Sequence, residues 1–212
     1  MNKFVSGFQS SDIEVVSREE CHKGFLNLEK IQLRHRLHSG GWSEQMRREL
    51  LLKPKAVGIL LFDPLRDEVL MVRQFRVGLI DEDTDCWPLE IVAGMVAEGE
   101  DLQDVAVREA MEESNSSPTN IMEIGQYYNS PGGSNEHITL FCGKVDTQGA
   151  EGVYGLAEEH EDIELVPLPY NELVAALGSS MINNAMTIIA LQWLILNKQH
   201  ILNSWLDGQA GE

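Results

Sequence analysis

The stretch of chain that most constrains the fold is Asp101–Ser114, which contains no glycine and no proline. Such a stretch favours a helix, because both residues are unfavourable in a helix interior. Asp101 is a residue type that caps helix N-termini, and Asp104 places a negative charge near the positive end of the helix dipole. The sequence therefore predicts a helix of about 14 residues that begins at Asp101.

One face of this predicted helix carries both apolar and acidic side chains. At about 100° per residue, Glu109 and Glu113 lie in line with Leu102 and Ala106, and Glu112 lies at the edge of that face. Carboxylates four residues apart repel each other, more strongly when they are partly buried, unless a cation or a proton neutralises them. Magnesium prefers oxygen ligands, so this face is a candidate metal site. The helix geometry alone leaves a solvated acidic surface open as an equal alternative.

The spacing around the helix is more specific than its composition. Gly94 is followed after five residues by Glu100, and after seven more by Arg108-Glu109, with Glu112-Glu113 beginning three residues beyond Glu109. This pattern resembles the Nudix box, G-x5-E-x7-R-E-U-x-E-E-x-G-U, in which U is an aliphatic residue. The charged and glycine positions match through the last glutamate.

The end of the box departs from this pattern at two positions. Asn115 stands where the box has its last glycine, and Ser116 stands where it has an aliphatic residue. Asparagine tolerates the left-handed backbone conformation that ends many helices, so Asn115 still suits a helix end. Neither departure changes a residue that the resemblance places at the metal.

Segments outside the box extend the resemblance to the ADP-ribose pyrophosphatase branch of the Nudix family. They are the turn at 130–136, the polar loop at 155–162, Asn183-Asn184-Ala185 and the run at 190–194, together with Ala93-Gly94-Met95, where the chain enters the box. The resemblance implies the α/β Nudix fold, in which a mixed β-sheet is sandwiched between helices (α/β/α), with a small N-terminal β-strand domain. It also implies the hydrolysis of ADP-ribose to AMP and ribose 5-phosphate, with Mg²⁺ (Mn²⁺ possible) as cofactor.

The same resemblance implies a role for individual residues. Glu159 would be the general base. The metal site would comprise the Ala93 carbonyl, Glu109 and Glu113, with Glu112 in support and Glu161 added when substrate binds. Residues implied in substrate binding are Phe25, Arg48, Glu49, Lys53, Arg76, Met95, Ser130, Pro131, Gly132 and Glu136.

Within that substrate set, Phe25 would stack on adenine and Arg76 would hold phosphate or the terminal ribose. Arg48 and Glu49 would reach the substrate of a neighbouring subunit, because this branch forms homodimers. Lys53 stands where relatives often carry arginine, so a bidentate contact is lost there.

Several of these residues also have a plain structural interpretation. Arg76 could pair with a surface acid, and Phe25 could belong to the core. The turn at 130–134 could be a simple connection, since proline and glycine favour turns. The loop at 158–162 could be only a solvated loop.

The rest of the chain alternates strands and helices without a regular βαβ repeat, which predicts a mixed sheet flanked by helices. A domain boundary is expected near residue 50. The resemblance implies a small β domain for dimerisation and substrate contacts at 1–50 and a Nudix catalytic domain at 51–212. Strands are expected at 12–17, 25–37, 56–62, 68–75, 120–129, 137–145 and 163–168, and helices at 101–114, 170–177 and 184–206.

Composition excludes several classes of protein. The net charge of −18 argues against a nucleic-acid partner. Residues 1–76 hold 13 of the 16 Lys and Arg and ten acids, whereas residues 77–212 hold three Lys and Arg and 24 acids. A site that binds both metal and anion would join these two parts. No apolar run is long enough for a membrane helix, and three widely spaced cysteines favour a reducing cytoplasm.

Two other functions stay open at this point. One is a pyrophosphatase for another nucleoside diphosphate sugar, because the box concerns only metal and phosphate. The other is a non-catalytic binding module on the same fold, although that module would be expected to have lost the catalytic glutamates. A calcium-binding EF-hand at Asp81 is excluded, because Cys86 and Val92 occupy the positions that need glycine and glutamate.

Overall fold

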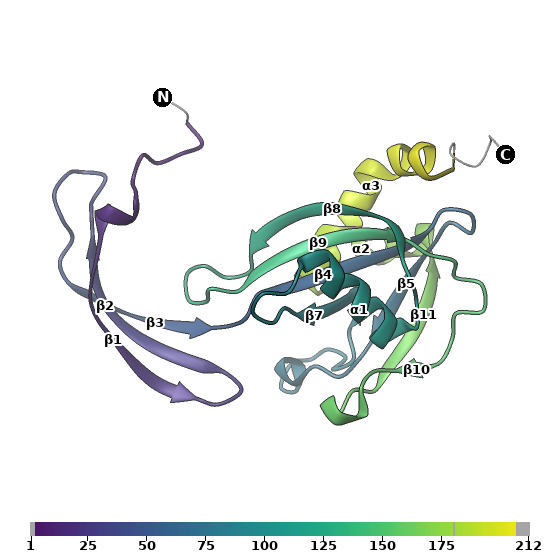
Figure 1. The fold of residues 1–212 in the computed structure, drawn as a ribbon, viewed down its shortest axis with the longest axis horizontal. Coiled ribbons are helices and arrows are strands. Elements are labelled where there is room, and N and C mark those ends of the chain that lie inside the picture. The colour runs from purple at the N-terminus through teal and green to yellow at the C-terminus, as the bar shows by residue number, and fades with distance from the viewer. Residues whose placement is uncertain (1–2, 180, 207–212) are drawn as a thin grey trace. The chain divides into compact units, whose positions relative to one another are not determined.

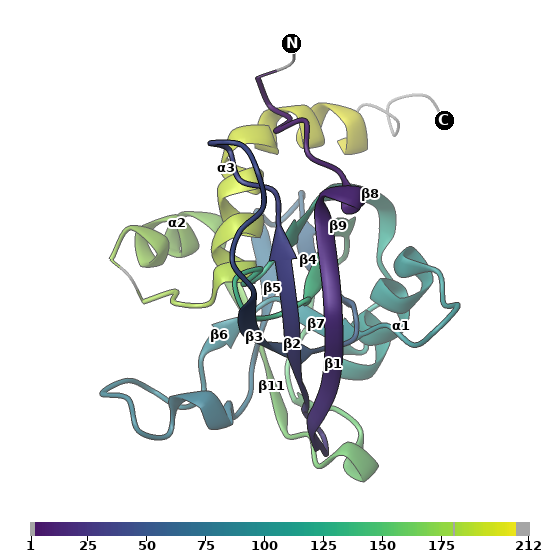
Figure 2. The same cartoon turned by 90° about the vertical axis from the view of Figure 1, so that its left-hand side faces the viewer.

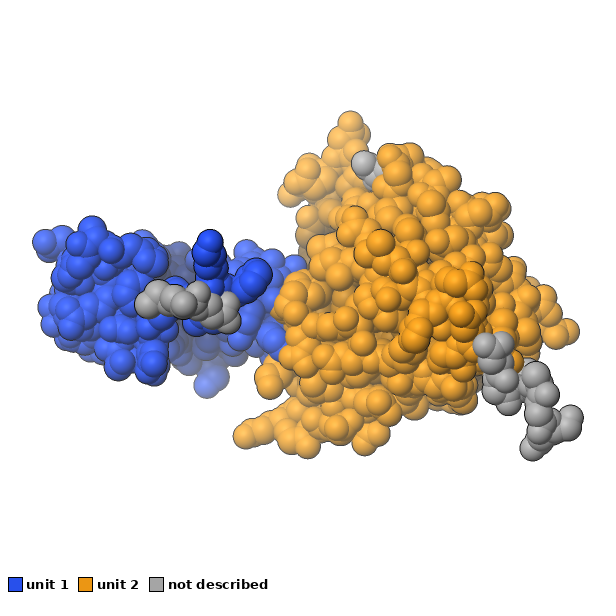
Figure 3. Space-filling view, turned by 90° about the horizontal axis from the view of Figure 1, so that it is seen from above, with its two compact units in different colours: residues 1–54, 128–137 blue, residues 55–127, 138–212 orange. Residues whose placement is uncertain are grey.

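The computed structural model describes residues 3–179 and 181–206 of the chain (Figure 1). The chain divides into two compact units, coloured separately in Figure 3. Unit 1 comprises residues 1–54 and 128–137, and unit 2 comprises residues 55–127 and 138–212.

Unit 1 is built on a three-stranded antiparallel sheet with the order β1-β2-β3. After a 3-10 turn η1 (Ser10–Asp12), its strands are β1 (Ile13–Lys23), β2 (Asn27–His35) and β3 (Met46–Leu52). Every residue of β1 is exposed, and Ile31 on β2 is the one buried residue among those described in this unit. The described part of unit 1 therefore has no hydrophobic core of its own.

Two features of this sheet differ from the sequence-based prediction. The first strand continues past Ser17 to Lys23, and β3 was not predicted. Charged residues fill the extra length of β1 without apolar alternation, and ion pairs such as Arg18–Glu29 at 2.7 Å replace apolar contacts across the strands. Strand β3 was missed because its sequence, MRRELLL, has no period of two.

Unit 2 is built on a larger mixed sheet, for which the described residues provide eight strands. Six strands follow the order β10-β11-β5-β4-β9-β8, while β6 pairs with β5 and β7 pairs with β4. Strand β4 pairs in parallel with β9 and antiparallel with β5 and β7. The strands are β4 (Ala56–Asp63), β5 (Glu68–Arg73), β6 (Leu89–Glu90), β7 (Val92–Met95), β8 (Thr119–Tyr128), β9 (His137–Lys144), β10 (Val153–Tyr154) and β11 (Ile163–Pro169).

Helices cover both faces of this sheet, as the predicted α/β/α arrangement requires. Helix α1 (Leu102–Ser114) packs on one face, and helices α2 (Tyr170–Gly178) and α3 (Ala185–Leu206) pack on the other (Figure 2). Strand β4 has no polar face, because alternate residues enter different cores. Leu60 joins the core with α2 and α3, whereas Ile59 joins the core with α1.

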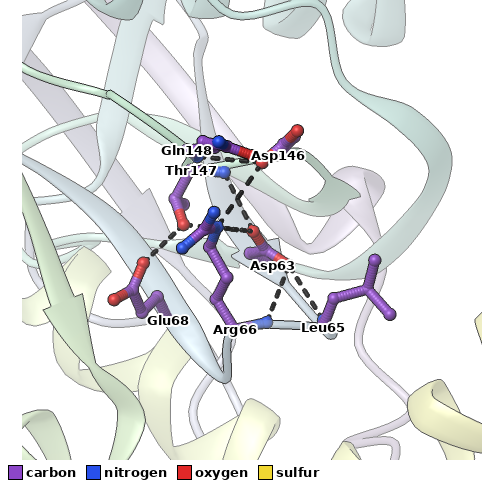
Figure 4. Close-up of polar contacts among 7 residues, drawn as sticks. All are labelled: Asp63, Leu65, Arg66, Glu68, Asp146, Thr147 and Gln148. Atoms are coloured by element: carbon purple, nitrogen blue, oxygen red, sulfur yellow. Dashed lines mark hydrogen bonds and ion pairs between the residues drawn. The ribbon is translucent and has the colours of Figure 1, made fainter.

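A buried polar cluster fixes the loop that follows β9 to the end of β4 (Figure 4). Both the backbone N–H and the hydroxyl of Thr147 donate to Asp63, at 2.9 and 3.1 Å, and the N–H groups of Leu65 and Arg66 donate to the other oxygen. Burial alone would raise the pKa of Asp63, but these hydrogen bonds lower the pKa by more than burial raises it, so the net pKa lies below its ordinary value. The charged carboxylate thus anchors the start of the long polar loop.

Two further observations concern the cysteines and the helices of the described residues. Cys21, Cys86 and Cys142 are all free. None of the helices in residues 3–179 and 181–206 is long and apolar enough to cross a membrane.

Candidate active site and metal centre

Helix α1 begins and ends as its sequence predicts. The Asp101 side chain accepts hydrogen bonds from the N–H groups of Gln103 and Asp104, at 2.9 and 3.2 Å. The helix ends at Asn115, whose φ of 49° and ψ of 33° are left-handed. The substitution of asparagine for the glycine of the box therefore preserves the helix end.

The carboxylates of α1 continue its buried face. Ala106 and Ala110 are fully buried, and Glu113, one turn beyond Ala110, is 2% exposed. The side chain of Glu109 is 13% exposed and that of Glu112 is 25% exposed. The alternative of a solvated acidic surface is therefore wrong for Glu113 and Glu109. Arg108 pairs with Glu112 at 2.8 Å and with Glu109 at 3.0 Å.

Strand β7 brings backbone atoms against these carboxylates. The N–H of Ala93 donates to Glu113 at 3.2 Å. A Cβ atom added at Gly94 would lie 1.9 Å from the carboxyl carbon of Glu109. A side chain at position 94 would therefore displace the Glu109 carboxylate from its present position.

The crowding of these acids changes their protonation. Burial, with the charges of Glu112 and Glu161, raises the pKa of Glu109 to about 7, although Arg108 acts in the opposite direction. Burial, with the charges of Glu109 and Glu161, raises the pKa of Glu113 to about 8, against the hydrogen bond from Ala93 and the charge of Arg76. One buried and one partly buried carboxyl, both with raised pKa values, form a centre that a cation would stabilise.

The chemistry of these donors fits a hard divalent cation. Two carboxylates and a backbone carbonyl offer oxygen ligands, and Mg²⁺ keeps several water ligands of its own. Among the described residues, no three His, Cys, Asp or Glu side chains are already arranged as a complete metal site. Besides the α1 carboxylates, the ligands of a bound metal would therefore be backbone, water or substrate oxygens, rather than a third side chain in its present position.

The loop at 155–162 carries two further predicted residues, Glu159 and Glu161. It contains a short 3-10 turn, η3 (Ala157–Glu159), which ends at His160 with a left-handed φ of 57°. The N–H of Gly155 donates to the carbonyl of Glu112 at 3.2 Å, and the N–H of Leu156 donates to the Glu161 carboxylate at 3.0 Å. Glu161 is thus held where its charge acts on Glu109 and Glu113, whereas Glu159 is exposed.

Arg76 has a buried partner that the sequence-based reasoning missed. Its Nε donates to Glu90 at 2.7 Å, and Glu90 is 4% exposed. The plain alternative of a surface ion pair is therefore wrong, because the acid lies in the interior. A signal was present in the sequence, since Glu90 is a lone carboxylate within the apolar run Leu89–Val92.

The other predicted substrate residues lie mainly in unit 1. Phe25 is 89% exposed in the turn after β1, so the alternative of a core residue is wrong. Arg48 and Glu49 are exposed on β3, and Lys53 forms an ion pair with Glu136. The turn at 130–132 (Ser130, Pro131 and Gly132) is exposed, and in unit 2 Met95 is 52% exposed on β7.

A sequence model of the NUDIX domain matches residues 52–181, and the chain therefore belongs to the Nudix family. Two curated relatives are similar over nearly the whole chain. An ADP-ribose pyrophosphatase of Escherichia coli (strain K12) is 39% identical over 198 residues, covering 93% of this chain and 95% of the relative. An ADP-ribose pyrophosphatase of Haemophilus influenzae is 38% identical over 204 residues, covering 95% of this chain and 94% of the relative.

Two more distant comparisons agree with this assignment. A GDP-mannose pyrophosphatase of Pectobacterium atrosepticum is 28% identical over 188 residues, covering 88% of this chain and 96% of the relative. The crystal structure of an ADP compounds hydrolase superposes with a TM-score of 0.68 at 19% identity, covering 94% of this chain and 96% of that one. This structure supports the Nudix fold.

Proposed function

We propose that this protein hydrolyses the pyrophosphate bond of ADP-ribose, giving AMP and ribose 5-phosphate, with Mg²⁺ as cofactor and Mn²⁺ as a possible replacement. The observation that carries the proposal is the buried carboxylate of Glu113 beside the partly buried carboxylate of Glu109, both packed against the backbone of Ala93 and Gly94. The similarity to two ADP-ribose pyrophosphatases over more than nine tenths of the chain supports the choice of substrate.

The proposed metal ligands are the Ala93 carbonyl, Glu109 and Glu113, with Glu161 joining them when substrate is present. A divalent ion held by these residues would screen the phosphate oxygens and lower the pKa of the attacking water. Glu112 supports the site through Arg108, which contacts both Glu112 and Glu109.

Glu159 is the proposed general base. It accepts a proton from the water whose oxygen attacks phosphorus, while the bond to the bridging oxygen breaks and its electron pair leaves with the second phosphate. The exposure of Glu159 on a loop suits this role, because loop movement can bring it to the water. Arg76 supplies a fixed positive charge for the phosphates.

Unit 1 is proposed to contribute substrate contacts and the dimer interface, with residues 1–50 as the small domain and 51–212 as the catalytic domain. Phe25 stacks on adenine, while Arg48 and Glu49 reach the substrate of the second subunit. Exposure along the whole of β1 supports a homodimer, because a sheet without a core gains stability when a second surface covers it.

The remaining substrate contacts are proposed for the turn residues 130–132, for Met95 and for the pair formed by Lys53 and Glu136. In that pair, burial alone would raise the pKa of Glu136, but Lys53 and Asn129 lower the pKa by more than burial raises it, so the net pKa lies below its ordinary value. A charged pair of this kind can hold polar groups of the sugar. We also propose a cytoplasmic location, in keeping with three free cysteines, and a small-molecule partner rather than nucleic acid.

A panel of nucleoside diphosphate sugars tests the substrate directly. The protein is incubated with Mg²⁺ and each of ADP-ribose, ADP-glucose, UDP-glucose and GDP-mannose, and the products are resolved by ion-exchange chromatography. The expected result is a kcat/KM for ADP-ribose well above the others, with AMP and ribose 5-phosphate as products. A higher kcat/KM for GDP-mannose would instead favour the alternative substrate class.

A further inference from the structure

From the contacts around Arg76, we infer that Glu90 and Asn184 form a positioning pair, which holds the Arg76 guanidinium by its Nε and leaves its two terminal nitrogens for substrate phosphate. The inference rests on the proposed function for the identity of the substrate. The structural part, a guanidinium fixed from the interior, stands on contacts within unit 2 alone.

Glu90 is a buried acid with both carboxylate oxygens engaged. One oxygen accepts from Arg76 Nε at 2.7 Å, and the other accepts from Asn184 Nδ2 at 2.5 Å. The side chain of Glu90 is 6% exposed, whereas that of Arg76 is 43% exposed. A buried charge held between a cationic and an amide donor fixes the near end of the guanidinium, while its far end reaches solvent.

Asn184 is itself held by the first turn of α3. Its Oδ1 accepts from the N–H of Thr187 at 3.1 Å, which orients the amide so that Nδ2 points to Glu90. The hydroxyl of Thr187, a fully buried residue, accepts from the N–H of Ile91 at 3.1 Å. The start of α3 therefore fixes both the carboxylate and the backbone of the segment that leads to Ala93.

The terminal nitrogens of Arg76 have a different environment. Within residues 3–179 and 181–206, the one hydrogen bond of its guanidinium is that from Nε. Glu90, which accepts from Nε, is three residues from Ala93, whose N–H donates to the carboxylate of Glu113. The guanidinium is thus held on the chain segment that leads to the proposed metal centre, and the four N–H groups of its two terminal nitrogens remain for phosphate oxygens.

A double-mutant cycle tests whether Glu90 acts through Arg76. The variants are Arg76→Ala, Glu90→Gln and the double variant, and the readouts are kcat/KM for ADP-ribose and the Kd of α,β-methylene-ADP, a diphosphate that cannot be hydrolysed. We expect about a hundredfold loss for Arg76→Ala, about a tenfold loss for Glu90→Gln, and no further loss in the double variant. A purely structural role for Glu90 predicts losses that multiply.

A spectroscopic readout separates this inference from the choice of substrate. The ¹⁵N–¹H signal of Arg76 Nε, assigned by its loss in Arg76→Lys, should be sharp and slow to exchange in the unaltered protein. It should exchange faster in Glu90→Gln and in Asn184→Ala. If ADP-ribose is not hydrolysed, the proposed function fails, while this signal and the Kd of the diphosphate still decide the positioning role.

Glu164→Gln is the matched control, because Glu164 pairs with Arg73 on the surface of the same sheet. It should leave kcat/KM, the Kd and the Arg76 signal unchanged. Unfolding temperatures of all variants show whether the fold is retained. An unchanged Arg76 signal and Kd in Glu90→Gln, or losses that multiply in the cycle, would overturn the inference.

Discussion

Helix α1 and the loop at 155–162 both carry acids of the proposed site, but they place them by different physical means. On α1, Glu113 is buried, and its position follows from the packing of Ala106 and Ala110. On the loop, Glu159 is exposed at the end of a single 3-10 turn. The helix therefore fixes the acids of the proposed metal site before any ligand binds, and their pKa values are raised as a result. The loop, in contrast, can move when the reaction takes place.

Glu113→Gln should have the largest effect, because it removes a buried carboxylate from the proposed metal ligands on α1. We expect turnover of ADP-ribose to fall by about 10³-fold or more, with the fold retained. Steady-state kinetics and thermal unfolding measure the two effects. Glu123→Gln, an exposed change on β8, is the control and should match the unaltered protein. Turnover near that of the unaltered protein in Glu113→Gln would contradict the metal assignment.

Glu159→Gln should have a smaller and different effect, because it alters the loop at 155–162 and not the proposed metal ligands on α1. Loss of the general base is expected to lower kcat by about 10²-fold. Magnesium affinity, measured by isothermal titration calorimetry, should stay nearly unchanged, unlike that of Glu113→Gln. A large fall in magnesium affinity would make Glu159 a ligand and would remove the distinction between helix and loop.

The raised pKa values on α1 predict how the stability of the metal-free protein depends on pH. The pKa values of Glu109 and Glu113 rise from 4.5 to about 7 and about 8 on folding, so the folded state binds these protons more tightly than the unfolded chain does. The free energy of unfolding should therefore fall as the pH rises from 4.5 towards about 8. The limiting slope is about 1.4 kcal/mol per pH unit for each such carboxyl.

Denaturant unfolding in EDTA at a series of pH values measures this slope. Glu113→Gln should flatten it, and added Mg²⁺ should reverse much of the loss at high pH. Glu159→Gln, on the loop, should leave the slope unchanged. A free energy of unfolding that is constant over this pH range would contradict the conclusion that folding raises the pKa values of Glu109 and Glu113.

The smallest expected effects come from the left-handed residues that end the two segments, Asn115 at 49° and His160 at 57°. Asn115→Gly should change the free energy of unfolding by less than about 1 kcal/mol and leave kcat unchanged, because the helix fixes the acids that precede it. His160→Gly should lower kcat by about twofold to fivefold, since glycine frees the backbone next to Glu159. Equal effects of the two changes on kcat would argue against the contrast between helix and loop.

The sequence predicted those parts that depend on neighbouring residues. The limits of α1, its end at Asn115 and the apolar strand β4 all follow from local composition and period. Strand β3 was missed because its partner β2 and the turn residue Ser134, which bridges to Leu51, stabilise it from elsewhere in the chain. The roles assigned to single residues, and the domain functions, stay predictions.

Glu90 shows why the site itself was harder to predict than the helix. Its partners Arg76 and Asn184 are 14 and 94 residues away, and no local pattern links them. A lone acid in an apolar run indicates a buried partner without saying which residue it is. Only the topology, which brings the start of α3 beside β6 and β7, identifies the pair.

The hydrogen bond from Ile91 to Thr187 spans 96 residues, and this has a consequence for biosynthesis. A ribosome completes α1 and the box long before it makes the start of α3. Until Asn184 and Thr187 emerge, the nascent chain lacks the donor to the second oxygen of Glu90 and the acceptor for the N–H of Ile91. Competence to bind the diphosphate is therefore acquired late in synthesis, and a chain interrupted ahead of α3 is expected to be inert rather than partly active.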